Sequence, residues 1–133
     1  MNLFFGESKP SSKGNIYHKD IEKETIKNKN YRKVVYTDDN IQLVLMSLIK
    51  GEDIHKEIHN GITQFFRIES GVGYAIVNKK KIALKNGTVL IIPPGIEHYV
   101  KQIGDKPLQL YTIYSPANHR PDRKDIRQPV KDD

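Results

Sequence analysis

The chain has 133 residues, no cysteine and a formal net charge of +6 at pH 7. A chain of this length is expected to form one domain around one core, and the lack of cysteine excludes disulfides and thiolate metal sites. No stretch approaches the ~20 apolar residues of a membrane span, and the first residues lack the basic and apolar regions of a secretory signal. We therefore expect a soluble, cytoplasmic protein with no membrane partner.

The positive charge is concentrated near the N-terminus. Residues 1–33 carry eight basic and four acidic side chains, whereas residues 34–115 and 116–133 are each close to neutral. The basic residues alternate with Asp and Glu and are not clustered with aromatic residues, which favours a solvated arm over a nucleic-acid partner. We predict a polar, basic and partly disordered N-terminal arm (1–30), a β domain (31–116) and a charged C-terminal tail (117–133).

The arm contains little regular periodicity. Ile16, Ile21 and Ile26 recur every five residues, a spacing typical of neither a helix nor a strand. We therefore expect an irregular or short strand-like lead-in that packs on the outside of the domain. No stretch of ten residues has convincing helical periodicity.

The central region alternates between short apolar runs and turn residues. Strands are predicted over residues 32–36, 41–49, 54–59, 63–69, 72–77, 81–84, 88–92, 97–103 and 108–114, with turns at Asn60-Gly61 and at Pro93-Pro94-Gly95. Such an even series of short strands is typical of an all-β sandwich or barrel. From residue 116 onward little can be buried, so residues 1–12 and 120–133 are predicted to be dispensable for stability.

Four side chains in this region have the chemistry of a metal site. Glu57 and His59 are two residues apart, so on an extended strand both project to one face. Gln64 follows five residues later, and His98 lies shortly after the Pro-Pro-Gly turn. Divalent transition metals accept imidazole nitrogen, carboxylate oxygen and amide oxygen as ligands. We therefore predict a metal site formed by Glu57, His59, Gln64 and His98 inside a β-barrel.

The stretches that contain these residues are GEDIHKEIHNGITQFFRIESG (51–71) and GTVLIIPPGIEHYVKQ (87–102). They resemble the paired motifs of the cupin superfamily. The first motif is a glycine, five residues, H-x-H, three or four residues, a glutamate, six residues and a glycine; the second is a glycine, five residues, P-x-G, two residues, a histidine, three residues and an asparagine. Glu57 stands in place of the first histidine, Gln64 in place of the glutamate and Gln102 in place of the asparagine.

The segments QFFRIESG and, further on, LYTIYSP also resemble small single-domain bacterial-type cupins. With the flanking strands, the resemblance covers residues from about 34 to about 116. It implies an all-β, RmlC-like jelly-roll barrel, that is, a double-stranded β-helix, with flexible N- and C-terminal extensions. It implies manganese or iron as the metal, with nickel, cobalt and zinc also accepted by these ligands.

The resemblance leaves two classes of function open. One is a metal-dependent oxygenase, decarboxylase or sugar isomerase that acts on a small oxygen-rich molecule. The other is a module that binds a small ligand or a metal without turnover. The resemblance also implies a homodimer, for which strands 32–36 and 41–49, together with the apolar residues of the arm, are the expected interface.

Other residues near the motifs have weaker signals. His55 shares strand parity with Glu57, but the motif frame excludes it from the ligands, so we expect it at the rim. Gln102, Tyr74 and Tyr111 could orient the ligands or a substrate from behind, with core packing as the alternative for the tyrosines. In addition, Arg67 and Glu69 are expected to face outward unless a bulge intervenes, and His18 and His119 carry no site signal.

Overall fold

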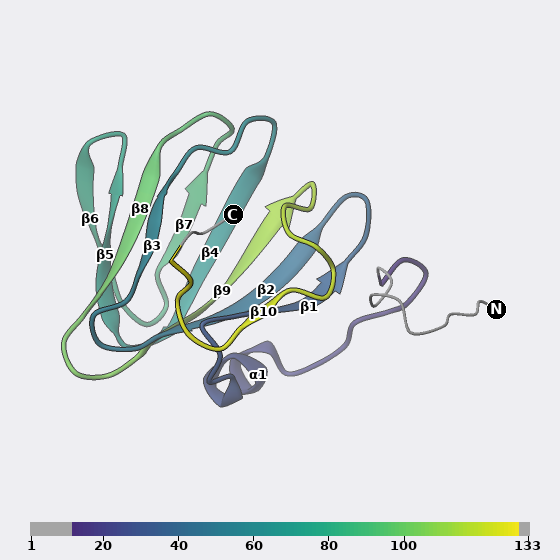
Figure 1. Ribbon diagram of the computed structural model, residues 1–133, viewed down its shortest axis with the longest axis horizontal. Coiled ribbons are helices and arrows are strands. Elements are labelled where there is room, and N and C mark those ends of the chain that lie inside the picture. Colours follow the sequence, from purple (N-terminus) through teal and green to yellow (C-terminus); the bar gives the residue numbers. More distant parts are fainter. Residues whose placement is uncertain (1–11, 131–133) are drawn as a thin grey trace.

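The computed structural model describes residues 12–130. Within them, short strands follow one another from β1 onward and a single short helix precedes them (Figure 1). The elements are α1 (Ile21–Lys27), β1 (Arg32–Thr37), β2 (Gln42–Leu48), β3 (Asp53–Glu57), β4 (Thr63–Ser70), β5 (Val72–Val77), β6 (Lys80–Leu84), β7 (Val89–Ile92), β8 (His98–Ile103), β9 (Leu108–Ser115) and β10 (Lys124–Asp125).

The strands form two antiparallel sheets. The six-stranded sheet has the order β10-β1-β2-β9-β4-β7, and the four-stranded sheet has the order β3-β8-β5-β6. From β2 to β9 the chain crosses repeatedly between the sheets, so that neighbours such as β4 and β9 are far apart in the sequence and the two sheets form a barrel. The predicted all-β jelly-roll fold is therefore confirmed, and each predicted strand overlaps an observed one.

The core lies between the two sheets because inward and outward side chains alternate along the strands. Along β4, for example, Gln64, Phe66 and Ile68 are buried, whereas Phe65 and Arg67 are only half-buried. The largest fully buried apolar side chains are Tyr31, Phe66, Met46, Leu48, Ile68, Ile92, Leu108 and Leu110. Three of the buried polar residues, Gln64, His98 and Thr112, belong to the group of side chains described below.

Gly71, the last glycine of the first motif, is required by a close contact between backbones. Its φ of +85° lies in the left-handed region, and a Cβ atom placed on it would lie 2.1 Å from the carbonyl oxygen of Pro107. Any other residue would both strain the β4–β5 turn and collide with the loop before β9. The lack of room for a side chain therefore explains why the motif has a glycine at this position.

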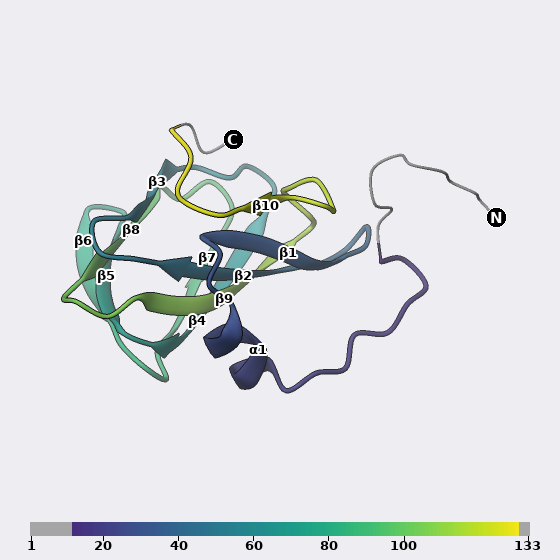
Figure 2. The same ribbon diagram turned by 60° about the horizontal axis from the view of Figure 1, so that its bottom comes forward.

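The lead-in to the barrel is helical, which corrects the prediction of an irregular or strand-like segment. Asp20 caps α1 by accepting a hydrogen bond from the backbone N–H of Lys23 at 3.1 Å, and acidic residues occupy the first turn. The helix lies against the outer face of the six-stranded sheet (Figure 2). There the buried Gln109 donates to the carbonyl oxygen of Ile26 at 2.9 Å. Capping and docking thus stabilise a helix too short to show periodicity.

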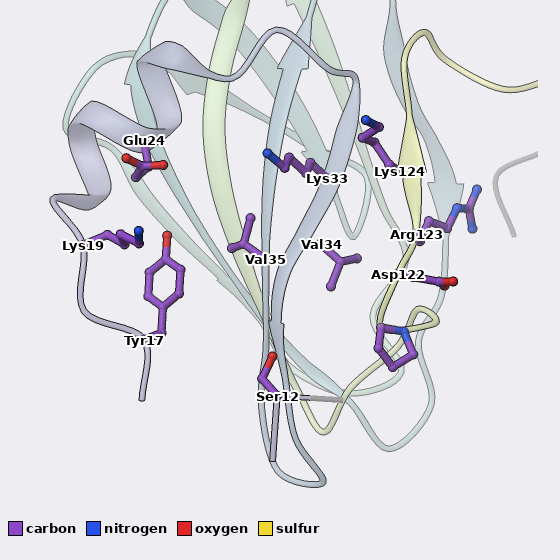
Figure 3. A pocket seen from close by; sticks show the side chains of 11 residues that line it. Ser12, Tyr17, Lys19, Glu24, Lys33, Val34, Val35, Asp122, Arg123 and Lys124 are labelled. Carbon is purple, nitrogen blue, oxygen red and sulfur yellow. The ribbon is translucent and has the colours of Figure 1, made fainter. Parts of the chain in front are cut away.

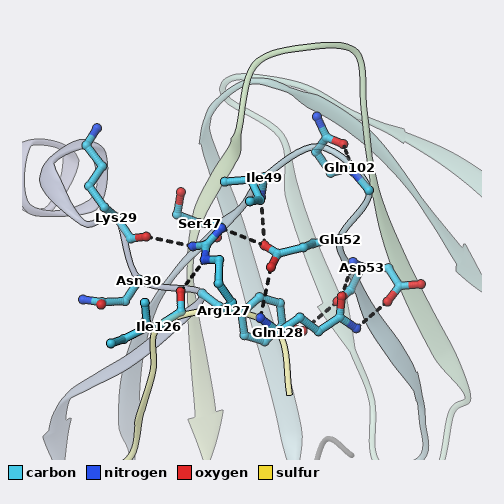
Figure 4. Close-up of polar contacts among 12 residues, drawn as sticks. Lys29, Asn30, Ser47, Ile49, Glu52, Asp53, Gln102, Ile126, Arg127 and Gln128 are labelled. Atoms are coloured by element: carbon cyan, nitrogen blue, oxygen red, sulfur yellow. Dashed lines mark hydrogen bonds and ion pairs between the residues drawn. The ribbon is translucent and has the colours of Figure 1, made fainter. Parts of the chain in front are cut away.

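The C-terminal segment packs against the barrel more closely than its composition predicts. β10 pairs with β1 through Arg32↔Asp125, and Arg32 Nη1 lies 2.6 Å from Asp125 Oδ2. Further on, Arg127 and Gln128 contact the start of β3 (Figure 4). Polar and charged partners on the barrel stabilise these contacts, so apolar burial was the wrong criterion for this tail. They argue against the prediction that residues 120–133 are dispensable, whereas residues 1–11 lie outside the described residues.

Among residues 12–130, no helix is long and apolar enough to cross a membrane.

Candidate metal centre

Glu57 and His98 are brought together by pairing between β3 and β8. Glu57 is the last residue of β3 and lies opposite His98, the first residue of β8. The end of β3 and the start of β8 are at the upper end of the barrel in Figure 1, where β7 ends and β4 begins. The pairing thus joins the first predicted motif to the second at one end of the fold.

A bulge in β3 determines which side chains of this strand face the interior. Ile54 pairs with Val100 and Glu57 pairs with His98, so three residues of advance along β3 match two along β8. Ile54 and Glu57 therefore both face inward, although simple alternation would separate them. His55 is left at the rim, as expected: its side chain is 37% exposed, and its Nε2 accepts a hydrogen bond from Gln128 Nε2 at 2.7 Å.

Glu57, His59 and His98 form a compact group. Glu57 Oε1 lies 3.0 Å from His59 Nε2 and 3.8 Å from His98 Nε2, and one ligand atom from each residue lies within 4.8 Å of the others. His59 comes from the loop after β3, and its ring centroid is 5.2 Å from that of His98. One carboxylate and two imidazoles at these separations could hold a divalent cation.

His98 is oriented by a backbone contact on its far side. Its Nδ1 lies 3.0 Å from the carbonyl oxygen of Ile96, which can only accept, so Nδ1 carries the proton and Nε2 keeps a lone pair. Burial lowers the pKa of His98 and so favours this neutral form. Nε2 is buried and has no hydrogen-bond partner within the described part of the chain. The imidazole is therefore prepared to act as a ligand.

Gln64 contributes a second buried acceptor atom, the oxygen of its side-chain amide. The side chain is 1% exposed, and its Nε2 donates to Thr112 Oγ1 at 3.0 Å. Its Oε1 is buried and lacks a hydrogen-bond partner among residues 12–130. Leaving a buried acceptor unpaired costs about 1–3 kcal/mol, and a bound cation would remove that cost. The donor set therefore fits a divalent transition metal.

Three residues beside the centre were not recognised in the sequence. Thr112 holds the Gln64 amide, and the buried Tyr114 ring meets the His59 ring edge-on at a centroid distance of 5.7 Å. The alternation of inward and outward residues along 108–114 could have indicated that Thr112 and Tyr114 face the interior. His119, for which we predicted no site signal, packs on Tyr114 at 5.2 Å. Its position after the last long strand gave no indication of this contact.

The other candidates for a supporting role have partners elsewhere. Gln102 is buried, accepts from the Gly51 N–H at 3.3 Å and donates to two carbonyl groups of the loop before β9. Tyr74 contacts Tyr99 and Lys81. These contacts involve turn and sheet packing, and a role in orienting the ligands stays a prediction for these residues.

Tyr111 lies on the outer face of the six-stranded sheet, whereas the position of Glu69 is determined by a bulge in β4. The Tyr111 ring stacks on Phe65 at 6.2 Å. A register shift between Ile68 and Ser70 inserts Glu69 as an extra residue. Its buried carboxylate lies 3.6 Å from the half-exposed guanidinium of Arg67. The bulge thus replaces the expected outward-facing pair with one buried and one exposed partner.

A pocket lies outside the barrel, away from this centre. It has a volume of about 450 Å³ and lies between the segment around α1, the strand β1 and the C-terminal segment (Figure 3). Its charged lining residues are Lys19, Glu24, Lys33, Asp122, Arg123 and Lys124. The two carboxylates among these cations make it a mixed-charge groove, and none of the candidate metal ligands lines it.

An antiparallel jelly-roll barrel with a glutamate and two histidines grouped at one end defines a class of small β-barrel proteins. A family model described as a cupin domain matches residues 44–114. This chain belongs to the cupin family.

The chain is also similar to individual known proteins. The chain is 42% identical over 123 residues to protein L612 of Acanthamoeba polyphaga mimivirus, covering 90% of this chain and 77% of that protein. It is 39% identical over 105 residues to YrkC of Bacillus subtilis, covering 74% of this chain and 56% of YrkC. The structure of BH2720 from Bacillus halodurans superposes with a TM-score of 0.84 at 32% identity, covering 88% of this chain and 93% of that one.

Proposed function

We propose that this cupin binds a divalent transition metal through Glu57, His59 and His98, with the amide oxygen of Gln64 as a fourth ligand. The observation that carries the proposal is the pair of buried, unpartnered acceptors, His98 Nε2 and Gln64 Oε1, in the described structure. The first of them lies beside the carboxylate that also contacts His59. Four protein ligands leave open positions on a metal that prefers six.

Manganese or iron is the proposed metal, and nickel, cobalt and zinc fit the same ligands. The set offers imidazole nitrogen and oxygen without sulfur, which does not favour the softer metals. Elemental analysis of the protein purified from its native host, followed by titration of the metal-free chain with each metal, tests this directly. A metal-free protein that binds none of these metals below millimolar concentration would contradict the proposal.

We propose further that the metal serves an enzyme of the oxygenase, decarboxylase or sugar isomerase type, acting on a small oxygen-rich molecule. When bound, the metal would act as a Lewis acid with positions open to such a molecule. The protein's part is to supply one compensating negative charge from Glu57, to hold His98 in its neutral form and to exclude water with Phe66, whose ring meets His98 at 6.2 Å. The alternative is a binding module without turnover.

Turnover distinguishes the enzyme from the binding module. The metal-loaded protein is to be screened for O₂ consumption and for conversion of small organic acids and sugar phosphates, with the metal-free protein as control. Metal-dependent turnover supports the enzyme, and tight binding without turnover supports the module. We propose the cytoplasm as the compartment, since a chain without cysteine needs no oxidising environment to fold.

We also propose that the protein is a homodimer, with the outer face of the six-stranded sheet as its interface. One row of outward apolar residues crosses four strands, because Leu43 pairs with Ile113, Ile113 with Phe65 and Phe65 with Ile91. Ile91 is 57% exposed. Of the two strands that the sequence favoured, β2 contributes Leu43 to this row, whereas the edge of β1 is already covered at Arg32 by β10. An apolar row of this kind is typical of a surface that meets its own copy.

A further inference from the structure

The bulge in β3 places two of its residues, His55 and Lys56, opposite Tyr99 of β8 alone. Without the extra residue, the alternation of side chains along the strand would turn Glu57 away from the interior. With it, the Glu57 carboxylate lies 3.8 Å from Nε2 of His98. The contact between these two proposed metal ligands therefore depends on the bulge being held in place.

The backbone of β3 has little regular pairing with which to hold this bulge. A bulge disrupts the ladder of hydrogen bonds locally and leaves its extra residue unpaired. In addition, β3 is the edge strand of the four-stranded sheet, so β8 is its one neighbour in that sheet. Side chains on the outer face of the sheet supply contacts that the ladder lacks.

Asp53, the first residue of β3, connects the strand to β8 across the bulge. Its Oδ2 accepts a hydrogen bond from the hydroxyl of Tyr99 at 2.8 Å. Tyr99 is the residue that lies opposite the bulge, so this contact joins the two strands at the point where their pairing is irregular. The Asp53 side chain is only 24% exposed, which partly shields the contact from water.

Gln128 of the C-terminal segment holds the other side of the bulge. Its Oε1 accepts a hydrogen bond from the backbone N–H of Asp53 at 3.0 Å, and its Nε2 donates to Asp53 Oδ1 at 2.6 Å (Figure 4). The same Nε2 lies 2.7 Å from Nε2 of His55, the first residue of the bulge. One side-chain amide thus binds the backbone and the carboxylate before the bulge and the ring within it.

We propose that Tyr99, Asp53 and Gln128 are positioning residues of the metal centre, because together they hold the bulge that turns Glu57 toward His98. The inference rests on the proposed metal function and adds residues that do not bind the metal themselves. It also gives the C-terminal segment a part in the site, besides its contacts with the barrel. Removing a group that bonds directly to a ligand typically costs 10–100-fold in metal affinity. Because this network acts through the backbone of β3, we expect a smaller loss, about fivefold.

Two substitutions remove the network from its two ends. Gln128→Ala removes the amide, and Tyr99→Phe removes only the hydroxyl, so each is expected to weaken metal binding by about fivefold in titrations of the metal-free chain. Arg127→Gln is the matched control on the same segment. It loses contacts with Glu52 and with two backbone carbonyl oxygens outside the bulge. It should lower the midpoint of thermal unfolding and leave metal affinity unchanged.

Cobalt loading distinguishes positioning from a general loss of stability. The visible absorption of bound Co²⁺ depends on the number and arrangement of its ligands. A displaced Glu57 therefore changes the spectrum, whereas a less stable fold with an intact site does not. We expect altered spectra in Gln128→Ala and Tyr99→Phe and the parent spectrum in Arg127→Gln. Parent-like affinity and spectra in both network variants, or equal changes in Arg127→Gln, would overturn the inference.

A measurement on the metal-free chain separates this inference from the proposed function. Nε2 of His59 and of His98 lies 3.0 and 3.8 Å from the Glu57 carboxylate, so the nitrogen NMR resonances of these rings at a fixed pH report where the carboxylate lies. Gln128→Ala should shift both resonances, and Arg127→Gln should leave them as in the parent. A chain that loads no metal but shows these shifts loses the metal function and keeps the positioning network. A chain that loads metal but shows no shift in Gln128→Ala keeps the metal function and loses the network.

Discussion

Gln64 donates its side-chain amide to the hydroxyl of Thr112 across the β4–β9 pair, at 3.0 Å. Both side chains are buried. The contact occupies the nitrogen of the amide and so determines which way its oxygen points. Thr112 therefore positions the oxygen that we propose as a metal ligand, without touching the metal itself.

Removing the Thr112 hydroxyl should weaken the metal site. Thr112→Val keeps the volume and leaves the Gln64 amide free to rotate, so we expect metal affinity to fall by about 10-fold, the lower end of the range for groups that orient ligands. Thr112→Ser keeps the hydroxyl and should bind as the parent does. Titration of the metal-free variants measures both. A site that lost metal equally in both variants would indicate a packing defect instead.

Alternating apolar residues and turn chemistry were sufficient to predict the barrel, because both are local properties of the sequence. The grouping of Glu57 with His98 also followed from the motifs. The details that complete the site are tertiary in origin. The β3 bulge arises from pairing with β8, and its position cannot be read from β3 alone.

The contacts of the two ends of the chain could not be predicted for a similar reason. His119 packs on Tyr114, beside the centre, where Gln42, far away in the sequence, binds the backbone around it. The α1 helix is too short to show periodicity, and its docking depends on Gln109. In each case one buried amide, which has no periodic signal, fixes a segment that local sequence describes as a loop.

The C-terminal segment is expected to contribute to stability. Gln128 Nε2 lies 2.6 Å from Asp53 Oδ1, and the backbone N–H of Gln128 donates to Glu52 Oε2 at 3.0 Å. Deleting residues 124–133 removes these contacts and the pairing of β10, so thermal unfolding should occur several degrees lower, because about 1 kcal/mol shifts the midpoint by a few degrees in a domain of this size. Deleting residues 1–11 serves as the comparison and is predicted to have little effect. Equal midpoints for parent and C-terminal deletion would show that the segment does not stabilise the barrel.

His119 should make the protein less stable in acid. Burial lowers its pKa to about 3, from an ordinary value of 6.5. Between these values the unfolded chain binds a proton that the folded chain excludes, so stability falls as the pH decreases through this window and is unaffected above it. One such group contributes a slope of up to about 1.4 kcal/mol per pH unit.

Denaturant unfolding between pH 7.5 and pH 4.5 tests this, with His119→Gln as the comparison. The variant keeps a side chain that can accept from Tyr114 but does not titrate, so its stability should change less with pH than that of the parent. Parallel curves for the two proteins would show that His119 titrates normally in the folded state.

The proposed dimer depends on the outer row of the six-stranded sheet. Ile91→Lys places a charge at the β7 end of that apolar row, at its most exposed residue, and should convert the dimer to a monomer. Ile103→Lys, at a position 43% exposed on β8 in the other sheet, should leave the dimer intact. Light scattering at micromolar concentration measures the mass directly. A parent mass near 15.3 kDa would contradict the proposal.

Glu57 is the one anionic residue of the proposed ligand set, in a family motif that usually places its carboxylate where Gln64 stands. Glu57→Gln keeps the size and one donor oxygen but removes the charge that partly neutralises a divalent cation. We therefore expect a large loss of metal affinity from this change, comparable to the loss in His59→Ala or His98→Ala. Gln64→Ala should weaken binding less, because water can replace a neutral oxygen donor.

Gln64→Glu completes the comparison, because it adds a carboxylate at the usual motif position while Glu57 is retained. A second anionic ligand should preserve metal binding and tighten it, although the new carboxylate can no longer donate to Thr112. Metal content and titration are measured across the series, with circular dichroism to confirm folding. If Glu57→Gln bound metal as the parent does while Gln64→Ala lost it, Glu57 would be a hydrogen-bond partner of His59 alone. The neutral amide would then be the ligand on which the site depends.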